Sequence, residues 1–486
     1  MKVTLTNKEI KLDGELPSSV VFEIITRCSY AVDGADKSPL YKKGRWDGTR
    51  KLFDARNRKA PIGLSQTILS ILGNANIQYE LEDKRNTTKG FGKLDVATAD
   101  ESIELRDYQT EAVNMAITNK VGVLNVATGG GKTVIASKLI ASLKCNTLFM
   151  VHTKDLMYQT IQSFEEVLCG TDSKIGQLGD GVTDIQPITV ATTQTVSKIL
   201  GIKYTKTIDG ESNEKESKIS RPEEVAKYVK SLDLVIWDEV HRIACEMATS
   251  IAKKLNCHYR IGLSASPWRD DGATLEIESA IGPEIFKLSA SELILRGFLV
   301  KPFIQFKSIE PKIQPQHDFR TYDQVYRQEI TENAVRNQII VDQAINWFNE
   351  GRSFLILVRT IKHGNTLKRM IKEQYHPIEF LSGRDSTEKR NNTIQLMRDG
   401  EVIGLIASVI ADEGLDIKRL SGAILAGGGK SSTRALQRVG RVLRPHPDKK
   451  DAFVVDFMDK ANYLEDHAKR RMSIYQTEEE FEIFTL

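Results

Sequence analysis

The residues with the clearest chemistry lie in the segment ATGGGKT, Ala127–Thr133, between two apolar runs. The run VGVLNV before it predicts a strand and VIASKLIASLK after it predicts a helix, which is the context that a phosphate-binding loop requires. Glycines let backbone N–H groups approach phosphate oxygens, while Lys132 would contact the β- and γ-phosphates and the Thr133 hydroxyl would bind Mg²⁺. Val126 stands where the usual spacing has Gly or Ala. We therefore expect ATP and Mg²⁺ as cofactors, held here by Thr128, Gly129, Gly130, Gly131, Lys132 and Thr133.

A second glycine-rich segment, AGGGKSS at 426–432, also follows an apolar run and resembles a phosphate loop. Only a weak acidic strand end, FVVDFMD, follows it, rather than an Asp-Glu pair. We interpret this segment as a strand-to-helix turn, or as a contact between lobes or with DNA through Lys430, and not as a nucleotide site.

The segment DLVIWDEVH ends an apolar run with two adjacent carboxylates. Asp238 is expected to hold Mg²⁺, and Glu239 is expected to orient and deprotonate the attacking water. His241 has two interpretations: a polar residue at a helix start, or a relay of the nucleotide state toward Gln437. Asp-Glu pairs are common on surfaces but much less common at the end of a buried strand, so the pair favours triphosphate hydrolysis.

The segment QRVGRVLR, Gln437–Arg444, spaces three arginines three residues apart, so they fall near one face of a helix. Arg441 and Arg444 are candidate arginine fingers, because a guanidinium can stabilise the charge that develops on the transferred phosphoryl group. Arg438 is expected to contact ATP. The alternative is a solvated basic helix face. The predicted catalytic residues are Glu239, Gln437, Arg441 and Arg444.

The segment LRDYQ, Leu105–Gln109, precedes the phosphate loop and adds two expected ATP contacts, Arg106 and Gln109. The Gln109 amide presents both a donor and an acceptor, as the edge of adenine requires. A Gln at a helix start is more often simply a polar residue.

The bulk composition describes an ordinary soluble protein. The chain has 486 residues, 40% hydrophobic and 27% charged, and a formal net charge of +3, so basic residues that bind DNA must be concentrated locally. Its five cysteines are widely spaced and form no zinc motif, which favours reduced thiols. The apolar runs are too short to span a bilayer, and the N-terminus lacks the apolar core of a secretion signal. We expect a cytoplasmic protein that contacts no membrane, in the host cytoplasm if the source is a phage.

The order of strand and helix signals predicts an α/β protein with two tandem lobes, each built on a parallel sheet, after a small α+β domain. A polar linker is expected at 83–95, and a mobile surface insertion at 203–224, which is nearly devoid of apolar residues. The predicted domains are a front domain (1–98), an ATP-binding lobe 1 (99–300), a lobe 2 (301–460) and a helical tail (461–486).

Together the motifs resemble those of superfamily 2 helicases. The resemblance rests on LRDYQ, ATGGGKT, DEVH, SAS (Ser264–Ser266), SVIADEGLDI (Ser408–Ile417) and QRVGRVLR. The stretch SASPWRDDG is similar to the corresponding stretch of XPB-type helicases. The resemblance implies two RecA-like lobes, a DNA-dependent ATPase, and an ATP contact from Asp416.

The front domain carries a shorter resemblance. GRWDG (Gly44–Gly48), followed by KLFD and IGL, is similar to the front domain of phage UvsW-type branch-migration helicases. This implies a motor that remodels forks and Holliday junctions in replication, recombination and repair, with duplex DNA bound by the front domain. The alternative for Trp46 is packing in a small core beneath a solvated basic turn, and the two roles can coexist. The expected DNA contacts are Lys42, Lys43, Arg45, Trp46, Thr153, Lys154, Thr192, Gln194, Arg359, Thr360 and Ser408.

Three alternatives stay open at this point. The motor could translocate on duplex DNA without separating strands, it could act on RNA, or the chain could be an ATP-gated DNA-binding protein without turnover. The presence of Glu239, Arg441 and Arg444 argues against the last. We expect DNA as the partner, with branched or forked duplex favoured, and a monomeric protein.

Overall fold

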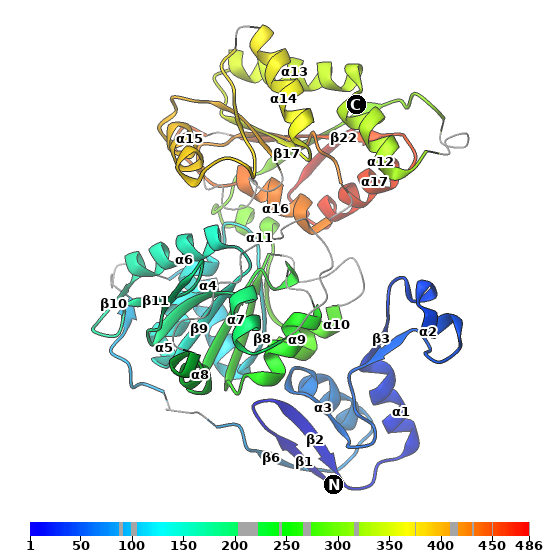
Figure 1. Cartoon of the computed structure of the whole chain (residues 1–486), viewed down its shortest axis with the longest axis vertical. Helices are drawn as coiled ribbons and strands as arrows, with labels where there is room; N and C mark the ends of the chain where they lie inside the picture. Colours follow the sequence, from blue (N-terminus) through cyan, green and yellow to red (C-terminus); the bar gives the residue numbers. More distant parts are fainter. Residues whose placement is uncertain are drawn as a thin grey trace. The chain divides into compact units, whose positions relative to one another are not determined.

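The computed structural model describes most of the chain and divides it into two compact units (Figure 1). The first unit comprises residues 1–126 and 131–287, and the second comprises 127–130 and 288–486. The described ranges are 1–86, 91–98, 105–202, 222–242, 245–265, 274–314, 320–374, 376–408, 417–429, 432–449 and 451–485.

The first unit begins with a small α+β domain around a four-stranded sheet of order β5-β2-β1-β6. Alternation places Val3 and Leu5 of β1 and Ile10 and Leu12 of β2 on the buried face, against two amphipathic helices. The elements are β1 (Lys2–Leu5), β2 (Glu9–Asp13), α1 (Ser18–Arg27), β5 (Lys59–Pro61), η2 (Ile62–Leu64), α3 (Ser65–Asn74) and β6 (Glu80–Asp83).

An arm of residues 29–51 extends from this sheet domain. Its base is the antiparallel pair β3 (Ser29–Ala31) and β4 (Thr49–Lys51), and its tip carries η1 (Ala35–Lys37) and α2 (Pro39–Lys42). Pro39 at the first turn and the Ser38 side chain, which accepts from Leu40 N, start the short helix.

The front domain packs against the rest of the first unit through backbone contact. A Cβ added to Gly63 of η2 would lie 1.9 Å from the carbonyl oxygen of Glu278, so no larger residue fits there. The Arg50 guanidinium at the base of the arm lies 2.5 Å from the buried carboxylate of Glu276. Val121 belongs to the front-domain core, although it starts the first strand of the following sheet. The first residue of that sheet therefore packs in the apolar core of the front domain.

The first large sheet has eight strands in the order β12-β11-β13-β9-β14-β15-β8-β16. From β11 to β8 the neighbouring strands are parallel, whereas β12 pairs antiparallel with β11. Continuous apolar runs such as VGVLNV suit strands that are buried on both faces. The strands are β8 (Val121–Val126), β9 (Thr147–Val151), β11 (Ile175–Gly179), β12 (Val182–Asp184), β13 (Ile188–Thr192), β14 (Leu234–Asp238), β15 (Tyr259–Ser264) and β16 (Glu284–Leu288).

Helices flank this sheet and complete its core (Figure 1). The segment that follows the predicted linker pairs with this sheet domain, since β7 (Ala97–Thr98) and β10 (Leu168–Cys169) form a two-stranded antiparallel pair. The helices are α4 (Asp107–Asn119), α5 (Lys132–Leu143), α6 (Lys154–Val167), α7 (Thr193–Ile199), α8 (Pro222–Lys230), η3 (Val240–Arg242), α9 (Cys245–Lys254) and α10 (Thr274–Ile281).

The second unit is built on a seven-stranded sheet of order β19-β20-β18-β21-β22-β17-β23, in which all neighbours are parallel. Helices α13 and α14 lie on one side of the sheet, and α16 and α17 lie on the other (Figure 1). The strands are β17 (Pro302–Ile309), β18 (Phe354–Val358), β19 (Glu379–Leu381), β20 (Gly404–Ser408), β21 (Gly422–Ile424), β22 (Ala452–Asp459) and β23 (Glu482–Thr485).

An aromatic insertion follows the first strand of this sheet. Its residues Val325, Tyr326 and Ile330 pack with Ala461 and Leu464 in a small cluster apart from the main core. The helices of the unit are α11 (Ala290–Leu295), α12 (Tyr322–Val325), the π-helical η5 (Tyr326–Thr331), α13 (Ala334–Asn349), α14 (Ile361–Glu373), α15 (Thr387–Asp399), α16 (Ser432–Val442) and α17 (Leu464–Tyr475).

The predicted fold class is confirmed: two parallel-sheet lobes follow a small α+β domain. The segment VVFEIITRCSYAV forms most of α1 and then β3. Residues 203–221 of the predicted insertion lie outside the described residues, and its last three residues begin α8. The tail contains the expected helix, α17, and also β23, which pairs with β17. In the described part of the chain, no helix is long and apolar enough to cross a membrane.

The compact units do not follow all the predicted domain borders. The border between them falls after Lys287, and α11 belongs to the second unit, where the Ser291 N–H and hydroxyl donate to Glu478 at 2.8 Å. The four-domain division stays a proposal about which segments fold independently.

Candidate active site

Three adjacent strands of the first sheet end beside one another. Their order is β14-β15-β8, and their register pairs Asp238 with Leu263 and Ser264 with Asn125. Because the carboxyl ends of parallel strands lie at one edge of the sheet, the phosphate loop after β8 and the acidic pair at the end of β14 share that edge. Sequence segments more than a hundred residues apart are thus brought to one place.

The loop between β8 and α5 has the backbone conformation that its glycines allow. Gly129 and Gly131 have φ of 92° and 82°, in the left-handed region, and Gly131 is the N-cap of α5. The Gly130 N–H donates to the Ala127 carbonyl at 3.0 Å. The predicted phosphate-binding residue Lys132 and magnesium ligand Thr133 form the first turn of the helix, where N–H groups and the helix dipole favour an anion.

A chain of polar contacts links the phosphate loop to the ends of β14 and β15. The Lys132 ammonium lies 3.2 Å from Glu239 Oε1, and His241 Nδ1 lies 3.4 Å from Glu239 Oε2. The same His241 nitrogen lies 2.8 Å from the Ser264 hydroxyl. The structure therefore brings together Lys132, Glu239, His241 and Ser264 of the SAS motif, and their roles in hydrolysis stay a prediction.

The two carboxylates of this site are held in an unusual state. Glu239 has a φ of 46°, a left-handed conformation that costs energy for a residue with a side chain. Burial, followed by the neighbouring Glu239 carboxylate, raises the pKa of Asp238 to about 6. The charge of a divalent cation bound at this buried carboxylate would favour its ionised form. Asp238 and Thr133 are the residues that would hold Mg²⁺.

Gln109 and Arg106, the other predicted ATP contacts of the first unit, start helix α4. Arg106 is its N-cap, and the Gln109 side-chain oxygen accepts from the Arg106 N–H at 3.1 Å. Gln109 is buried, and a Cβ added to Gly131 would lie 2.4 Å from its Nε2. Gln109 thus contacts the phosphate loop directly, and recognition of adenine by it stays a prediction.

Arg438 and Arg441 lie on α16 of the second unit, and Arg444 follows two residues after this helix ends at Val442. Ala435, Val439 and Val442 form the buried stripe of this helix. Gln437 and Arg441 are four residues apart on another face of the helix and are partly exposed, as is Arg444 beyond the helix end, whereas Arg438 is buried. The helix packs on α17 and on strands β21 and β22 of its own unit. Contact of Arg441 and Arg444 with the phosphates of ATP stays a prediction.

Lys449 is a residue of this region that the sequence analysis missed. Its ammonium donates to the carbonyl oxygens of Val442 and, at 2.8 Å, of Arg444, just where α16 ends. Burial, followed by the charge of Arg444, lowers the pKa of Lys449 to about 7. The available signal was a lysine shortly after the helix end, where a cation can satisfy the last carbonyl groups.

The backbone carbonyl groups of the second glycine-rich loop accept hydrogen bonds from side chains of the same unit, which hold the loop in place. Arg336 donates to the Ala426 oxygen at 2.8 Å, the Tyr326 hydroxyl donates to Gly427 at 2.9 Å, and Arg471 donates to Gly429 at 2.6 Å. A Cβ on Gly427 would lie 2.8 Å from the backbone nitrogen of Arg359, so this glycine allows the two backbone segments to pack closely. Lys430 lies outside the described residues.

The predicted DNA contacts of the first unit lie at the carboxyl ends of two neighbouring strands, β9 and β13. The hydroxyls of Thr153 and Thr192 cap α6 and α7. Lys154 lies 3.8 Å from Asp180, and the Gln194 amide donates to the His152 carbonyl at 3.1 Å, joining the two loops. These side chains fix the loops, and their contact with DNA stays a prediction.

In the second unit the corresponding candidates have similar positions. The Thr360 hydroxyl caps α14, and Ser408 ends β20 with its side chain buried. Arg359 is exposed and donates to the Tyr322 hydroxyl at 3.0 Å, with its guanidinium over the Tyr326 ring. Asp416 lies outside the described residues.

In the front domain, the candidates lie on the arm. Lys42, Lys43 and Arg45 are exposed, and Trp46 is partly buried with its Nε1 donating to the Thr49 carbonyl at 2.7 Å. This agrees with both interpretations of Trp46, since the indole is anchored while the basic residues around it face solvent.

The chain matches two known protein families. Residues 102–269 match the res subunit of type III restriction enzymes, and residues 336–446 match the helicase conserved C-terminal domain. The chain is 27% identical over 477 residues to the ATP-dependent DNA helicase uvsW of Enterobacteria phage T4, covering 93% of this chain and 89% of the relative. The chain belongs to the superfamily 2 helicases and is an ATP-dependent enzyme.

Two further comparisons agree with this. The chain is 27% identical over 419 residues to the DNA 3'-5' translocase XPB2 of Sulfurisphaera tokodaii, covering 79% of this chain and 87% of the relative. The DNA-bound crystal structure of the helicase MrfA superposes with a TM-score of 0.55 at 15% identity, covering 79% of this chain and 50% of that one, which shows a common fold.

Proposed function

We propose that this protein is an ATP-driven DNA helicase or translocase that remodels forked and branched duplexes, as in replication, recombination and repair. The observation that carries the proposal is the contact of Lys132 with Glu239, extended through His241 to Ser264. A lysine expected to bind phosphate and a carboxylate expected to activate water lie at one edge of the sheet and form an ion pair with each other.

Binding of ATP would exchange the partner of Lys132. The triphosphate carries more negative charge than Glu239, so its β- and γ-oxygens would attract the ammonium away from the carboxylate. Glu239 would then be free to accept a proton from the attacking water. Asp238 and Thr133 would hold Mg²⁺, which supplies charge neutralisation at the phosphates.

His241 links this exchange to a neighbouring strand. Once Glu239 loses Lys132, its contact with His241 changes, and His241 also contacts Ser264 at the end of β15. The state of the nucleotide would thereby reach the segment that follows Ser264. In the second unit, Arg441 and Arg444 would stabilise the transferred phosphoryl group when the two lobes close.

DNA as the substrate is supported by the relatives. The similar proteins include a DNA helicase of phage T4 and an archaeal DNA translocase. Branched DNA is supported by the front domain, whose basic arm resembles that of branch-migration helicases. Helix N-termini at Thr153 and Thr360, together with exposed Lys154 and Arg359, suit backbone phosphates rather than base edges.

The test is ATP turnover compared side by side with single-stranded DNA, blunt duplex, forked duplex, Holliday junction and RNA at one salt concentration. We expect the largest stimulation with the fork or junction, and strand displacement or branch migration on the same substrates. Stimulation by blunt duplex without strand displacement would favour a duplex translocase, and stimulation by RNA alone would contradict the proposal.

Replacing the proposed base gives the first mutational prediction. Glu239→Gln keeps the shape of the side chain but cannot accept the proton, so hydrolysis should slow by about 10²–10⁴-fold. ATP affinity should persist or increase, because the amide no longer holds Lys132. Single-turnover hydrolysis and nucleotide binding should be measured together, and an unchanged hydrolysis rate would remove Glu239 from the mechanism.

A further inference from the structure

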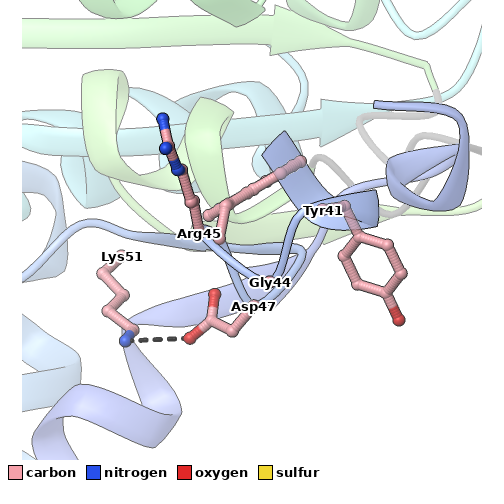
Figure 2. Close-up of a pocket in the computed structure, with 6 residues that line it drawn as sticks. Tyr41, Gly44, Arg45, Asp47 and Lys51 are labelled. Carbon is pink, nitrogen blue, oxygen red and sulfur yellow. Dashed lines mark ion pairs between the residues drawn. The ribbon is translucent and has the colours of Figure 1, made fainter. Parts of the chain in front are cut away.

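The arm of the front domain contains an open depression that no step of ATP hydrolysis uses. It has a volume of about 710 Å³ and is lined by Tyr41, Gly44, Arg45, Trp46, Asp47 and Lys51 (Figure 2). Two aromatic rings, two cations and one carboxylate therefore surround a space near the tip of an exposed hairpin.

The loop that forms this depression is held in one conformation. Asp47 accepts from the Thr49 N–H at 3.0 Å and from the Thr49 hydroxyl at 2.7 Å, while the Trp46 indole donates to the Thr49 carbonyl. Gly48 has a φ of 77°, and a Cβ added to it would lie 3.0 Å from the Tyr41 ring. One side of that ring thus rests on the backbone. The loop is ordered before a ligand arrives, which reduces the entropic cost of binding.

The charges of the loop favour a polyanion. Residues 41–51 contain five cations and a single carboxylate, Asp47. The Lys51 ammonium lies 3.0 Å from Asp47, so much of its charge is already neutralised. Arg45 is exposed and extends from the loop in a different direction from Tyr41 (Figure 2). It offers a planar guanidinium that can bind one phosphate group with two hydrogen bonds.

Binding of duplex DNA would not require the two aromatic rings that line this depression. Contacts with a duplex backbone require cations and N–H donors, whereas partly exposed aromatic rings next to cations are typical of sites that stack single-stranded bases. Tyr41 is 43% exposed, so its ring is available on the side away from Gly48.

We propose that this depression binds an unpaired nucleotide of DNA, with the base stacked on Tyr41 or Trp46 and the adjacent phosphate bound by Arg45. The proposal rests on the proposed function, since a fork or junction provides unpaired nucleotides beside a duplex. The arm also connects to the motor, because Arg50 at its base contacts Glu276 of α10. An arm holding the unpaired strand would keep the branch point close to lobe 1.

The test compares the affinity of the full-length protein for three DNAs of equal length and at one salt concentration: a fork with unpaired arms, a single strand and a blunt duplex. Tyr41→Ala and Trp46→Ala should each weaken binding to the fork and the single strand by about tenfold, the scale of one lost stacked base. Affinity for the blunt duplex should change by less than about twofold. Arg45→Ala should weaken fork binding and reduce its salt dependence by about one counterion.

Two variants control for damage to the arm and for general loss of aromatic surface. Trp46→Phe loses the hydrogen bond to Thr49 but keeps a ring, so it should retain most of the fork affinity. Phe22→Ala removes a 71% exposed ring on α1, outside the depression, and should leave all three affinities unchanged. Basal ATP turnover should be normal in every variant, which reports a folded motor.

Equal loss of fork and duplex affinity would show that the arm binds only backbone phosphates, and unchanged affinities would show that the depression binds no DNA; either result overturns the proposal. A wild-type protein that binds no DNA and is not stimulated by any would instead contradict the proposed function itself. The two failures are therefore distinguishable.

Discussion

Two glycine-rich loops with nearly the same sequence, ATGGGKT and AGGGKSS, follow buried strands in different units and have opposite surroundings. At the first loop, glycines at positive φ lead into α5, and the nearby side chains are Lys132 and the acidic pair of β14. At the second, the carbonyls of Ala426, Gly427 and Gly429 accept from Arg336, Tyr326 and Arg471. A loop that binds phosphate offers its N–H groups to the ligand, whereas this one uses its carbonyl groups to bind its own unit.

The difference shows what a glycine pattern can and cannot predict. Glycine permits close approach of a backbone, but the partner is selected by residues far away in the sequence. For the first loop the partners are Glu239 and Gln109, and for the second they are buried arginines of α13 and α17. The Asp-Glu pair at a strand end, rather than the glycines, distinguishes the two loops in the sequence.

The strongest test of this contrast replaces the lysine of each loop. Lys132→Ala should reduce ATP turnover beyond the roughly 10³-fold typical of one lost transition-state donor, because Lys132 contacts phosphate directly. Lys430→Ala, its counterpart in the second loop, should leave turnover and ATP affinity almost unchanged. Both are measured by steady-state turnover and nucleotide binding. Normal turnover in Lys132→Ala, or a large loss in Lys430→Ala, would mean that the two loops have been assigned the wrong way round.

The arginines of α16 give the next largest effect. Arg441→Ala should slow hydrolysis by about 10³-fold, the low end for an arginine finger because Arg444 remains, with little loss of ATP affinity. DNA stimulation should disappear while DNA affinity persists. Arg441→Lys keeps the charge but loses the planar fork, so it should recover little. Retained stimulation would exclude Arg441 as a finger.

Arg471, which holds the second glycine-rich loop through the Gly429 carbonyl, should contribute to stability rather than to catalysis. Arg471 is buried and binds both Asp456 and the Gly429 carbonyl. Arg471→Met leaves the Asp456 carboxylate buried without its cation, which should destabilise the second unit by about 3–5 kcal/mol. The measurement is amide hydrogen exchange of β22. Lys469→Ala, on an exposed part of the same helix, is the matched control and should change exchange very little. Equal exchange rates in the two variants would show that Arg471 does not stabilise the second unit.

The smallest predicted effect is a pH dependence in the same unit. Burial, followed by the charge of Arg336, lowers the pKa of His363 to about 3, whereas an unfolded histidine titrates near 6.5. Between these values only the unfolded chain binds the proton, so stability is constant above about pH 6.5 and falls as the pH decreases toward 3. From pH 6.5 to 5 the loss should be about 2 kcal/mol.

His363→Gln should remove this slope, and hydrogen exchange of α14 at pH 7 and pH 5 measures it after correction for intrinsic exchange rates. A variant with the same slope as the wild type would show that His363 does not titrate in this window.

The sequence predicted the sheet strands well because their apolar runs are continuous and bounded by polar residues, as in VGVLNV and FLILV. It assigned Lys132 and the acidic pair to one nucleotide site, because strand–loop–helix order fixes which strand end each motif occupies, but it did not predict the direct contact of Lys132 with Glu239. It could not predict β23, because EIFT is short and its partner β17 is far away in sequence. The contact of Ser264 with His241 and the role of Lys449 were missed for a related reason: they depend on the positions of His241 and of the end of α16.

Gly63 has a consequence for the history and engineering of the protein. Because its Cα lies directly against the backbone of α10, a front domain taken from a relative would have to keep a glycine at this position, or the facing turn of α10 would have to change with it. Val121 would also lose its packing partners in such a chimaera, since it starts a strand of the large sheet but packs in the core of the front domain. A chimaera joined at a linker would therefore separate two segments that pack on each other although they lie far apart in the sequence, the front domain and α10.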